Sequence, residues 1–166
     1  MLILVSDTSI LIDLDRGGLL ELAFSCGLAM VVPDLLYQRE LENENGPYLQ
    51  KLGLGVVALT PEEVAFAQVL RTKRTALSLP DCFALICGMR PGHVLLTGDK
   101  ALRNEAKART GAVYGLLWLL DQMKATTAVS SEQLHEGLSR IVAHLRCRLP
   151  AEEVKDRLTA WSGPTS

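Results

Sequence analysis

Short apolar runs alternate along this chain with longer segments in which apolar residues recur at helical spacing. Strands are predicted at residues 1–6, 30–33, 56–59, 94–97 and 113–114. Helices are predicted over residues 10–15, over a second stretch ending at 24, and over 35–44, 60–74, 78–87, 99–109 and 116–124. The first strand is apolar without alternation, as in a parallel sheet covered on both faces. The alternation of elements predicts an α/β fold with a central parallel sheet.

Turn and cap residues mark several boundaries of these elements. Asn45-Gly46-Pro47 has strong turn chemistry and is predicted to end the helix over 35–44. Thr60-Pro61-Glu62-Glu63 combines a cap residue, a proline at the first helical position and acids in the first turn, so a helix is expected to start there.

The C-terminal part is predicted to be purely helical. A Thr- and Ala-rich break at residues 125–129 precedes Ser130 and Gln133, which resemble a capping box opening a helix to about Arg148. A second helix is expected from 149 to Trp161. An apolar stripe at helical spacing contains Leu134, Leu138, Ile141, Val142 and Leu145. We therefore divide the chain into a body over 1–124 and a helical hairpin over 125–166, packed on the body or on a second subunit.

Composition agrees with a single compact domain. The chain has 166 residues, and 48% of them are hydrophobic, enough for a full core. No apolar run approaches the length of a membrane span or of a signal-peptide core, so we expect a cytoplasmic protein without a membrane partner. Its four cysteines lack metal-binding spacing and are expected to be free thiols. The net charge of −2 argues against coating nucleic acid by bulk electrostatics, so any such contact must be local.

Four acidic residues lie where predicted elements begin or end, namely Asp7, Glu40, Asp81 and Asp99. Residues just beyond the strand ends of an α/β sheet share one crevice, so distant acids can converge there. Carboxylates brought together repel one another, and at least one should then have a raised pKa. A divalent cation would neutralise them, and hard oxygen ligands select Mg²⁺ or Mn²⁺, whose hydrolytic use is phosphoryl transfer. The pattern points to a metal-dependent nuclease.

Each acid also has a simpler interpretation. Asp7 and Asp99 could serve only as N-caps, and Asp81, three residues after Ser78, could complete a capping box. Glu40 could be one of several solvated charges. Capping does not explain why acids recur at strand ends in this order, and an apolar strand followed closely by Asp occurs at both Asp7 and Asp99.

The four acids lie in segments that resemble those of PIN-domain nucleases, the family that includes VapC-type toxins. The similar segments are Leu4–Leu14, Val32–Leu41, Leu77–Leu85 and Leu95–Arg103, followed by residues 115–121. The resemblance spans about 1–123, and its motifs occur in the right order. It implies a three-layer α/β/α sandwich, endonuclease activity on single-stranded RNA and pairing as a homodimer. A toxin of this kind would have an antitoxin protein as partner.

The chain departs from the family pattern at two positions. Ser9 stands where many members have Asn, and Leu102 stands where some have a further acid, so Asp99 has no substitute. The register of the second acid is open between Glu40 and Glu42, and Glu40 is chosen on the family pattern.

The expected mechanism uses the acids as metal ligands. Asp7 and Asp99 would bind the cation directly, and Asp81 and Glu40 would complete the cluster. A water acidified by the cation would attack the phosphate in line. Ser9 and Thr97 could hydrogen-bond a carboxylate from outside the ligand set. Lys100, Arg103 and Lys107 recur at helical spacing beside Asp99 and could bind flanking phosphates, or they could form only a solvated helix face.

Other functional classes fit less of the sequence. A receiver domain needs adjacent acids after its first strand, and a haloacid-dehalogenase-like phosphatase needs Asp-x-Asp, whereas this chain has Asp7-Thr8-Ser9. The remaining alternative is a catalytically silent binding module with the same fold, acting through protein or RNA contacts.

Overall fold

A computed structural model describes residues 2–163 and contains a five-stranded, all-parallel sheet in the order β3-β2-β1-β4-β5. The strands are β1 (Ile3–Ser6), β2 (Ala29–Pro33), β3 (Gly55–Val57), β4 (His93–Leu96) and β5 (Val113–Tyr114). All five predicted strands are present, and the third begins and ends earlier than expected. Met1, expected in the first strand, lies outside the described residues.

The central strand β1 is the topological switch point of the sheet, where the strand order reverses. Strands β2 and β3 extend the sheet on one side of β1, and β4 and β5 extend it on the other. Ser6 is paired with Leu96, so the carboxyl ends of β1 and β4 lie side by side at one edge. This edge is where α/β sheets form their ligand-binding crevice.

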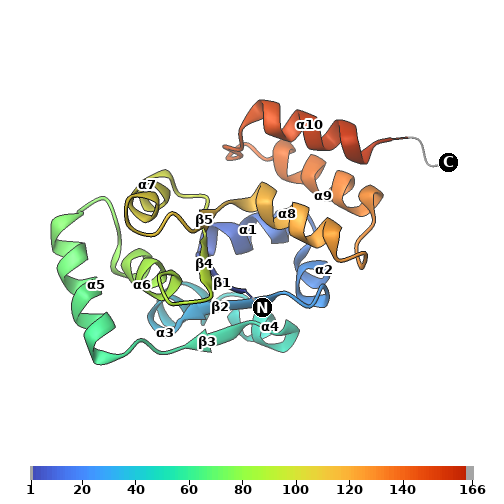
Figure 1. The fold of residues 1–166 in the computed structure, drawn as a ribbon. Helices are drawn as coiled ribbons and strands as arrows, with labels where there is room; N and C mark the ends of the chain where they lie inside the picture. The colour runs from blue at the N-terminus through green and yellow to red at the C-terminus, as the bar shows by residue number, and fades with distance from the viewer. Residues whose placement is uncertain (1, 164–166) are drawn as a thin grey trace.

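Helices cover both faces of the sheet, as the three-layer prediction required. The first half of the chain contains α1 (Thr8–Arg16), α2 (Leu20–Ser25), α3 (Asp34–Leu36) and α4 (Gly46–Leu52). Then follow α5 (Pro61–Lys73), α6 (Leu79–Gly88), α7 (Lys100–Arg109) and α8 (Leu116–Ala125). Helix α6 packs on β1, β2 and β4, with α5 outside it, and Figure 1 shows α1 and α8 on the opposite face.

Helix α6 lies close to the sheet because its sequence is almost wholly apolar after the cap. Cys82, Leu85 and Cys87 are fully buried, and both cysteines are free thiols. A Cβ added at Gly88 would lie 3.0 Å from Leu95 Cβ, so a glycine there allows α6 to approach β4. This packing fixes the first turn of α6, which carries Asp81, beside the sheet edge.

The segment after β2 differs from the single helix predicted over 35–44. Helix α3 passes into a π-helix, η1 (Tyr37–Leu41), in which the Glu42 N–H donates to the Tyr37 carbonyl at 2.7 Å. The predicted turn at 45–47 does end this segment, but it also opens α4, which was not predicted. Pro47 lies in the first turn of α4, where the missing proline N–H costs no hydrogen bond.

The C-terminal hairpin consists of α9 (Ser131–Ala143) and α10 (Ala151–Trp161), and it packs on the body through α9, which contacts α1 and α8. The capping box of Ser130 and Gln133 is present. The prediction that this helix reaches Arg148 is wrong, because His144 leaves the helical conformation. Cys147 N–H then donates to the His144 carbonyl at 3.0 Å, forming the turn that brings the chain back.

The predicted apolar stripe is therefore only partly a core face. Leu134, Leu138 and Ile141 are buried, whereas Val142 is 39% exposed and Leu145 is fully exposed. Over residues 2–163, no helix has the length and apolar content needed to cross a membrane.

Candidate active site

Asp7 is a buried carboxylate at the carboxyl end of the central strand. Its side chain is only 4% exposed, and its backbone N–H still donates to Leu96 of β4 at 3.0 Å. Oδ1 accepts from Ser9 Oγ at 2.7 Å and from the Ile10 N–H at 3.2 Å, while Oδ2 accepts from the Thr97 hydroxyl. Asp7 therefore caps α1 and also joins β1 to the segment after β4.

Burial raises the pKa of Asp7 to about 6, against an ordinary value of 3.8. Hydrogen bonds from Thr97 and Ser9 act in the opposite direction, and the nearby charge of Asp81 raises the pKa further. Asp7 is therefore still mostly ionised at neutral pH, but its charge is less stable in this buried position than on an exposed carboxylate.

Asp99 begins α7 and is linked to Asp7 through one threonine. The Asp99 N–H donates to Thr97 Oγ1 at 2.9 Å, the same hydroxyl that donates to Asp7. Ser9 Oγ accepts from the Gly98 N–H at 2.9 Å and ties the same two loops together. Asp99 Oδ1 accepts from the Leu102 N–H at 2.8 Å, which is a helix cap. The structure thus ties the Asp99 backbone to the Asp7 carboxylate through Thr97 at the β1–β4 crevice, while the Asp99 side chain is exposed and caps its own helix.

Glu40 and Asp81 approach this network from two other elements. Glu40 lies on η1, and its Oε1 accepts from Thr8 Oγ1 at 2.9 Å, next to Asp7. Asp81 lies in the first turn of α6, where Oδ2 accepts from the Ser78 N–H at 3.0 Å. Burial raises the pKa of Glu40, the Thr8 hydrogen bond lowers it, and the charge of Asp81 raises it.

The pKa of Asp7 and of Glu40 is raised mainly by burial, and the charge of Asp81 adds a smaller contribution to each. Asp81 therefore lies within electrostatic reach of both Asp7 and Glu40. Glu40 is also partly buried, whereas Glu42 and Glu44 are exposed, which favours Glu40 as the second acid.

The donor set suits a hard divalent cation. Over residues 2–163, none of the four acids forms an ion pair with Lys, Arg or His. For Asp7, the one buried member of the four, this is unusual, because buried carboxylates normally have a counter-charge. Within the same range, no three His, Cys, Asp or Glu side chains stand close enough to hold one ion between them. Mg²⁺ often takes only one or two protein carboxylates and keeps several waters, so the chemistry of the residues fits this cation.

The three predicted phosphate-binding cations lie beside Asp99. Lys100, Arg103 and Lys107 line a hollow that also contains Ser9 and Asp99. The guanidinium group of Arg103 already makes one hydrogen bond, because its Nη2 donates to the Thr97 carbonyl at 3.0 Å. Thr8, which orients Glu40, was not identified from the sequence, although a hydroxyl directly after Asp7 was the available signal.

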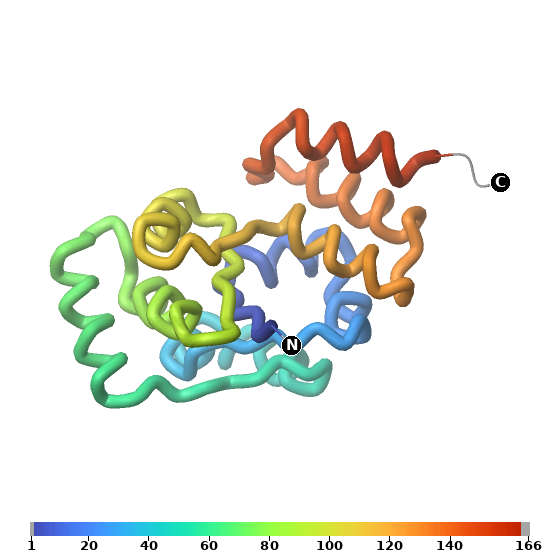
Figure 2. Tube along the Cα trace, viewed as in Figure 1, coloured from blue at the N-terminus to red at the C-terminus, as the bar shows by residue number. Residues whose placement is uncertain are grey.

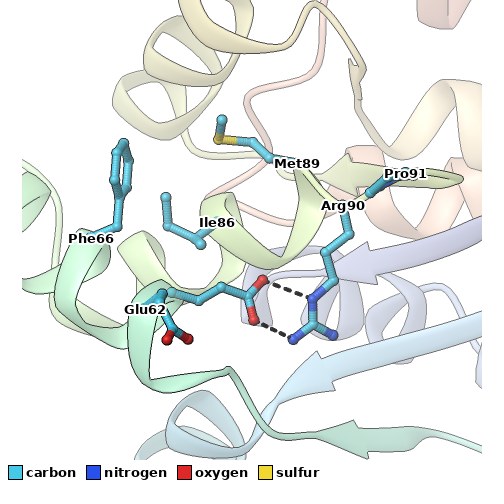
Figure 3. Close-up of a pocket in the computed structure, with 7 residues that line it drawn as sticks. Glu62, Phe66, Ile86, Met89, Arg90 and Pro91 are labelled. Carbon is cyan, nitrogen blue, oxygen red and sulfur yellow. Dashed lines mark hydrogen bonds and ion pairs between the residues drawn. The ribbon is translucent and has the colours of Figure 1, made fainter.

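A second hollow lies between α5 and α6 and has no comparable chemistry (Figure 3). Phe66, Ile86 and Met89 supply its apolar lining. Arg90 donates to both carboxylate oxygens of Glu63, at 2.9 and 2.7 Å, and holds the pKa of Glu63 at about 2. This ion pair joins α5 to the segment after α6 and satisfies both charges, as expected of a structural contact between the two helices.

Comparison with known proteins gives one family. A family model described as a PIN domain matches residues 3–162. No curated protein and no solved structure matches the chain.

Proposed function

Because the chain belongs to the PIN-domain family, we propose that it is a metal-dependent endoribonuclease that hydrolyses phosphodiester bonds of single-stranded RNA. PIN domains are generally nucleases and typically use divalent metals. The finer assignment, to endonuclease cleavage of single-stranded RNA with Mg²⁺ or Mn²⁺, is the proposal.

The observation that carries the proposal is the state of Asp7. It is a nearly inaccessible carboxylate at the sheet's switch point, it has no ion-pair partner among residues 2–163, and Asp81 repels it. A group used only to cap α1 gains nothing from such burial, because a cap works as well at an exposed position. A cation beside Asp7 would supply the counter-charge.

In this proposal Asp7 and Asp99 hold the cation, and Asp81 and Glu40 complete the acidic site. When bound, the cation supplies an acidified water and a counter-charge for the phosphate. Ser9 and Thr97 hold the Asp7 carboxylate in one orientation, and Thr8 does the same for Glu40. Fixed carboxylates allow an ion to bind without first reorganising the site.

One observation favours the second candidate, a silent binding module. Asp7, Asp81 and Asp99 all accept backbone hydrogen bonds as helix caps, and no three acids are gathered into a chelating group over residues 2–163. Under this alternative the fold holds RNA or a protein without cleaving it.

A toxin role with an antitoxin partner, and pairing as a homodimer, extend the proposal through the resemblance to VapC-type toxins. RNA cleavage can be tested separately from these two properties, because the cleavage chemistry needs neither an antitoxin nor a second subunit.

The test is cleavage of a circular single-stranded RNA, which has no ends for an exonuclease. The wild type should open the circle in Mn²⁺ or Mg²⁺ and not in excess chelator. Asp7→Asn and Asp81→Asn should abolish cleavage, and Asp15→Asn, which removes an exposed acid of α1, should not. A wild type that binds the circle but leaves it closed with both metals would favour the binding module.

A further inference from the structure

One hollow of the molecule is strongly basic although the chain is net negative. It has a volume of about 740 Å³ and lies between α1, the first turns of α7 and the connector 144–150 of the hairpin. We call it the basic groove. Its cationic residues are Arg16, Lys100, Arg103, Lys107, Arg146 and Arg148, and its acidic residues are Asp13 and Asp99. Six of the chain's 17 Lys and Arg residues thus line one hollow of a protein with net charge −2.

Most cations of the basic groove have no carboxylate partner in the described part of the chain. Over residues 2–163, only Arg16 among them has an ion pair, a loose one to Asp13 at 3.8 Å. Outside the groove, five arginines are paired with carboxylates, namely Arg74, Arg90, Arg109, Arg140 and Arg157. Six cations against two carboxylates leave the lining of the groove net positive, which is the electrostatic footprint of an anion-binding surface.

The connector is held in place by the docking of the hairpin. A Cβ added at Gly137 of α9 would lie 2.5 Å from Leu19 Cδ1, and one at Gly17 would lie 2.8 Å from Ile141 Cδ1. Only glycines allow this close approach. Figure 2 shows the turn between α9 and α10 at the end of the hairpin that faces α7. Tight docking of α9 therefore sets the connector, with Arg146 and Arg148, across the groove from α7.

The hairpin is fixed at a second point as well. Arg157 of α10 donates to both carboxylate oxygens of Asp121 on α8, at 2.9 and 2.7 Å. With α9 packed on α1 and α10 tied to α8, the connector has little freedom to move away from the groove. A preorganised cationic wall binds an anion at a lower entropic cost than a mobile one.

We infer that the basic groove holds the backbone phosphates of single-stranded RNA, and that Arg146 and Arg148 of the hairpin form the wall opposite α7. This inference rests on the proposed function and adds the hairpin to the substrate site. The groove contains Asp99 and also Ser9, whose hydroxyl donates to Asp7, so a strand lying in it would pass next to the acidic site. Its volume suits a few nucleotides of a single strand, as in other basic grooves that follow a single-stranded backbone.

The test measures RNA binding separately from cleavage. The full chain is titrated into a fluorescent 12-nucleotide oligouridylate in excess chelator, and fluorescence anisotropy is recorded at several salt concentrations. The variant is Arg146→Gln/Arg148→Gln. The matched control is Lys51→Gln/Lys155→Gln, which removes two exposed charges outside the groove.

Loss of two phosphate contacts should lower the slope of log affinity against log salt by about 1.4, since each contributes roughly 0.7 on a single strand. If the two affinities converge near 1 M salt, binding at 0.1 M is then roughly 25-fold weaker. The control should bind like the wild type. Arg146→Lys/Arg148→Lys should restore most of the affinity and the slope, which a purely structural role of the arginines would not predict. In Mn²⁺, the Gln variant should raise KM for cleavage and leave kcat nearly unchanged.

Several results would overturn the inference. One is a Gln variant that binds RNA like the control, even if the wild type cleaves RNA. Another is a wild type that does not bind the RNA but binds a polyglutamate peptide, which would indicate that the groove is a docking site for acidic protein segments. A third outcome separates the two claims. If the wild type does not cleave RNA, and RNA binding is lost in Arg146→Gln/Arg148→Gln but kept in the wild type and the control, the nuclease function is refuted and RNA binding in the basic groove is supported.

Discussion

Replacing Asp7 by asparagine should make the metal-free protein more stable at neutral pH. Burial places the pKa of Asp7 at about 6 instead of 3.8. One pKa unit corresponds to about 1.36 kcal/mol, so ionised Asp7 costs the folded state about 3 kcal/mol. Asparagine has the same shape and no charge. Its amide would face the Thr97 hydroxyl, which can accept instead of donating, at a cost that does not depend on pH.

The direction of the pH dependence follows from the raised pKa. The folded state holds the Asp7 proton more tightly than the unfolded chain, so the favourable contribution is complete below about pH 3.8. It declines as pH rises and is lost once pH passes about 6. Slightly less than half of the loss, on the order of 1 kcal/mol, falls between pH 5 and pH 7.5.

Urea unfolding in excess chelator at pH 5 and pH 7.5 measures this effect. The wild type should lose on the order of 1 kcal/mol more stability than Asp7→Asn between the two pH values, since other titrating groups are shared and cancel. Asp15→Asn, an exposed acid on the same helix, should behave like the wild type. Adding Mn²⁺ at pH 7.5 should stabilise the wild type and not Asp7→Asn. Equal pH dependence in wild type and Asp7→Asn would refute the claim that Asp7 ionises in a desolvated site.

Three further predictions concern the second acid, proton competition and the hairpin. Glu40→Gln should lower metal-dependent RNA cleavage at least tenfold, and Glu42→Gln should leave it within about twofold, since only Glu40 is held by a hydroxyl beside Asp7. The affinity for Mn²⁺, measured by calorimetry, should fall up to tenfold per pH unit below about pH 6, because a proton on Asp7 competes with the ion. Gly137→Ala should destabilise the protein by about 1–2 kcal/mol in thermal unfolding, because its Cβ would overlap the buried Leu19. An unchanged melt for Gly137→Ala would mean that α9 does not pack as closely as described.

Most of the fold could be predicted from the sequence, because the strands and most of the helices are marked by short sequence patterns. Apolar runs gave the five strands, and the capping residues Thr60, Ser78 and Ser130 gave the starts of α5, α6 and α9. The π-helix η1 has no such local signal in the sequence, and its first and last residues, Tyr37 and Leu41, are buried in the core. Helix α4 was missed because Asn-Gly-Pro also opens a helix when apolar residues such as Leu49 follow and can be buried.

The acids were predictable to the extent that they follow strands. Asp7 and Asp99 were identified from strand ends, and the Thr97 network joins them in the structure. Two features depend on tertiary packing and could not be read from spacing. One is the Thr8–Glu40 hydrogen bond across 32 residues, and the other is the position of Arg146 and Arg148 across from α7. Each requires that separate elements first be docked.

The central claim is that the acids at the β1–β4 crevice bind a divalent cation, and a Mn²⁺ titration at pH 7.5 followed by calorimetry tests it most directly. The account predicts saturable binding to the wild type, loss of binding in Asp7→Asn and Asp99→Asn, and wild-type binding in Glu42→Gln. Thermal melts with and without Mn²⁺ should follow the same order. A wild type that binds no Mn²⁺ at millimolar concentrations, or an Asp7→Asn variant that binds it equally well, would contradict the account.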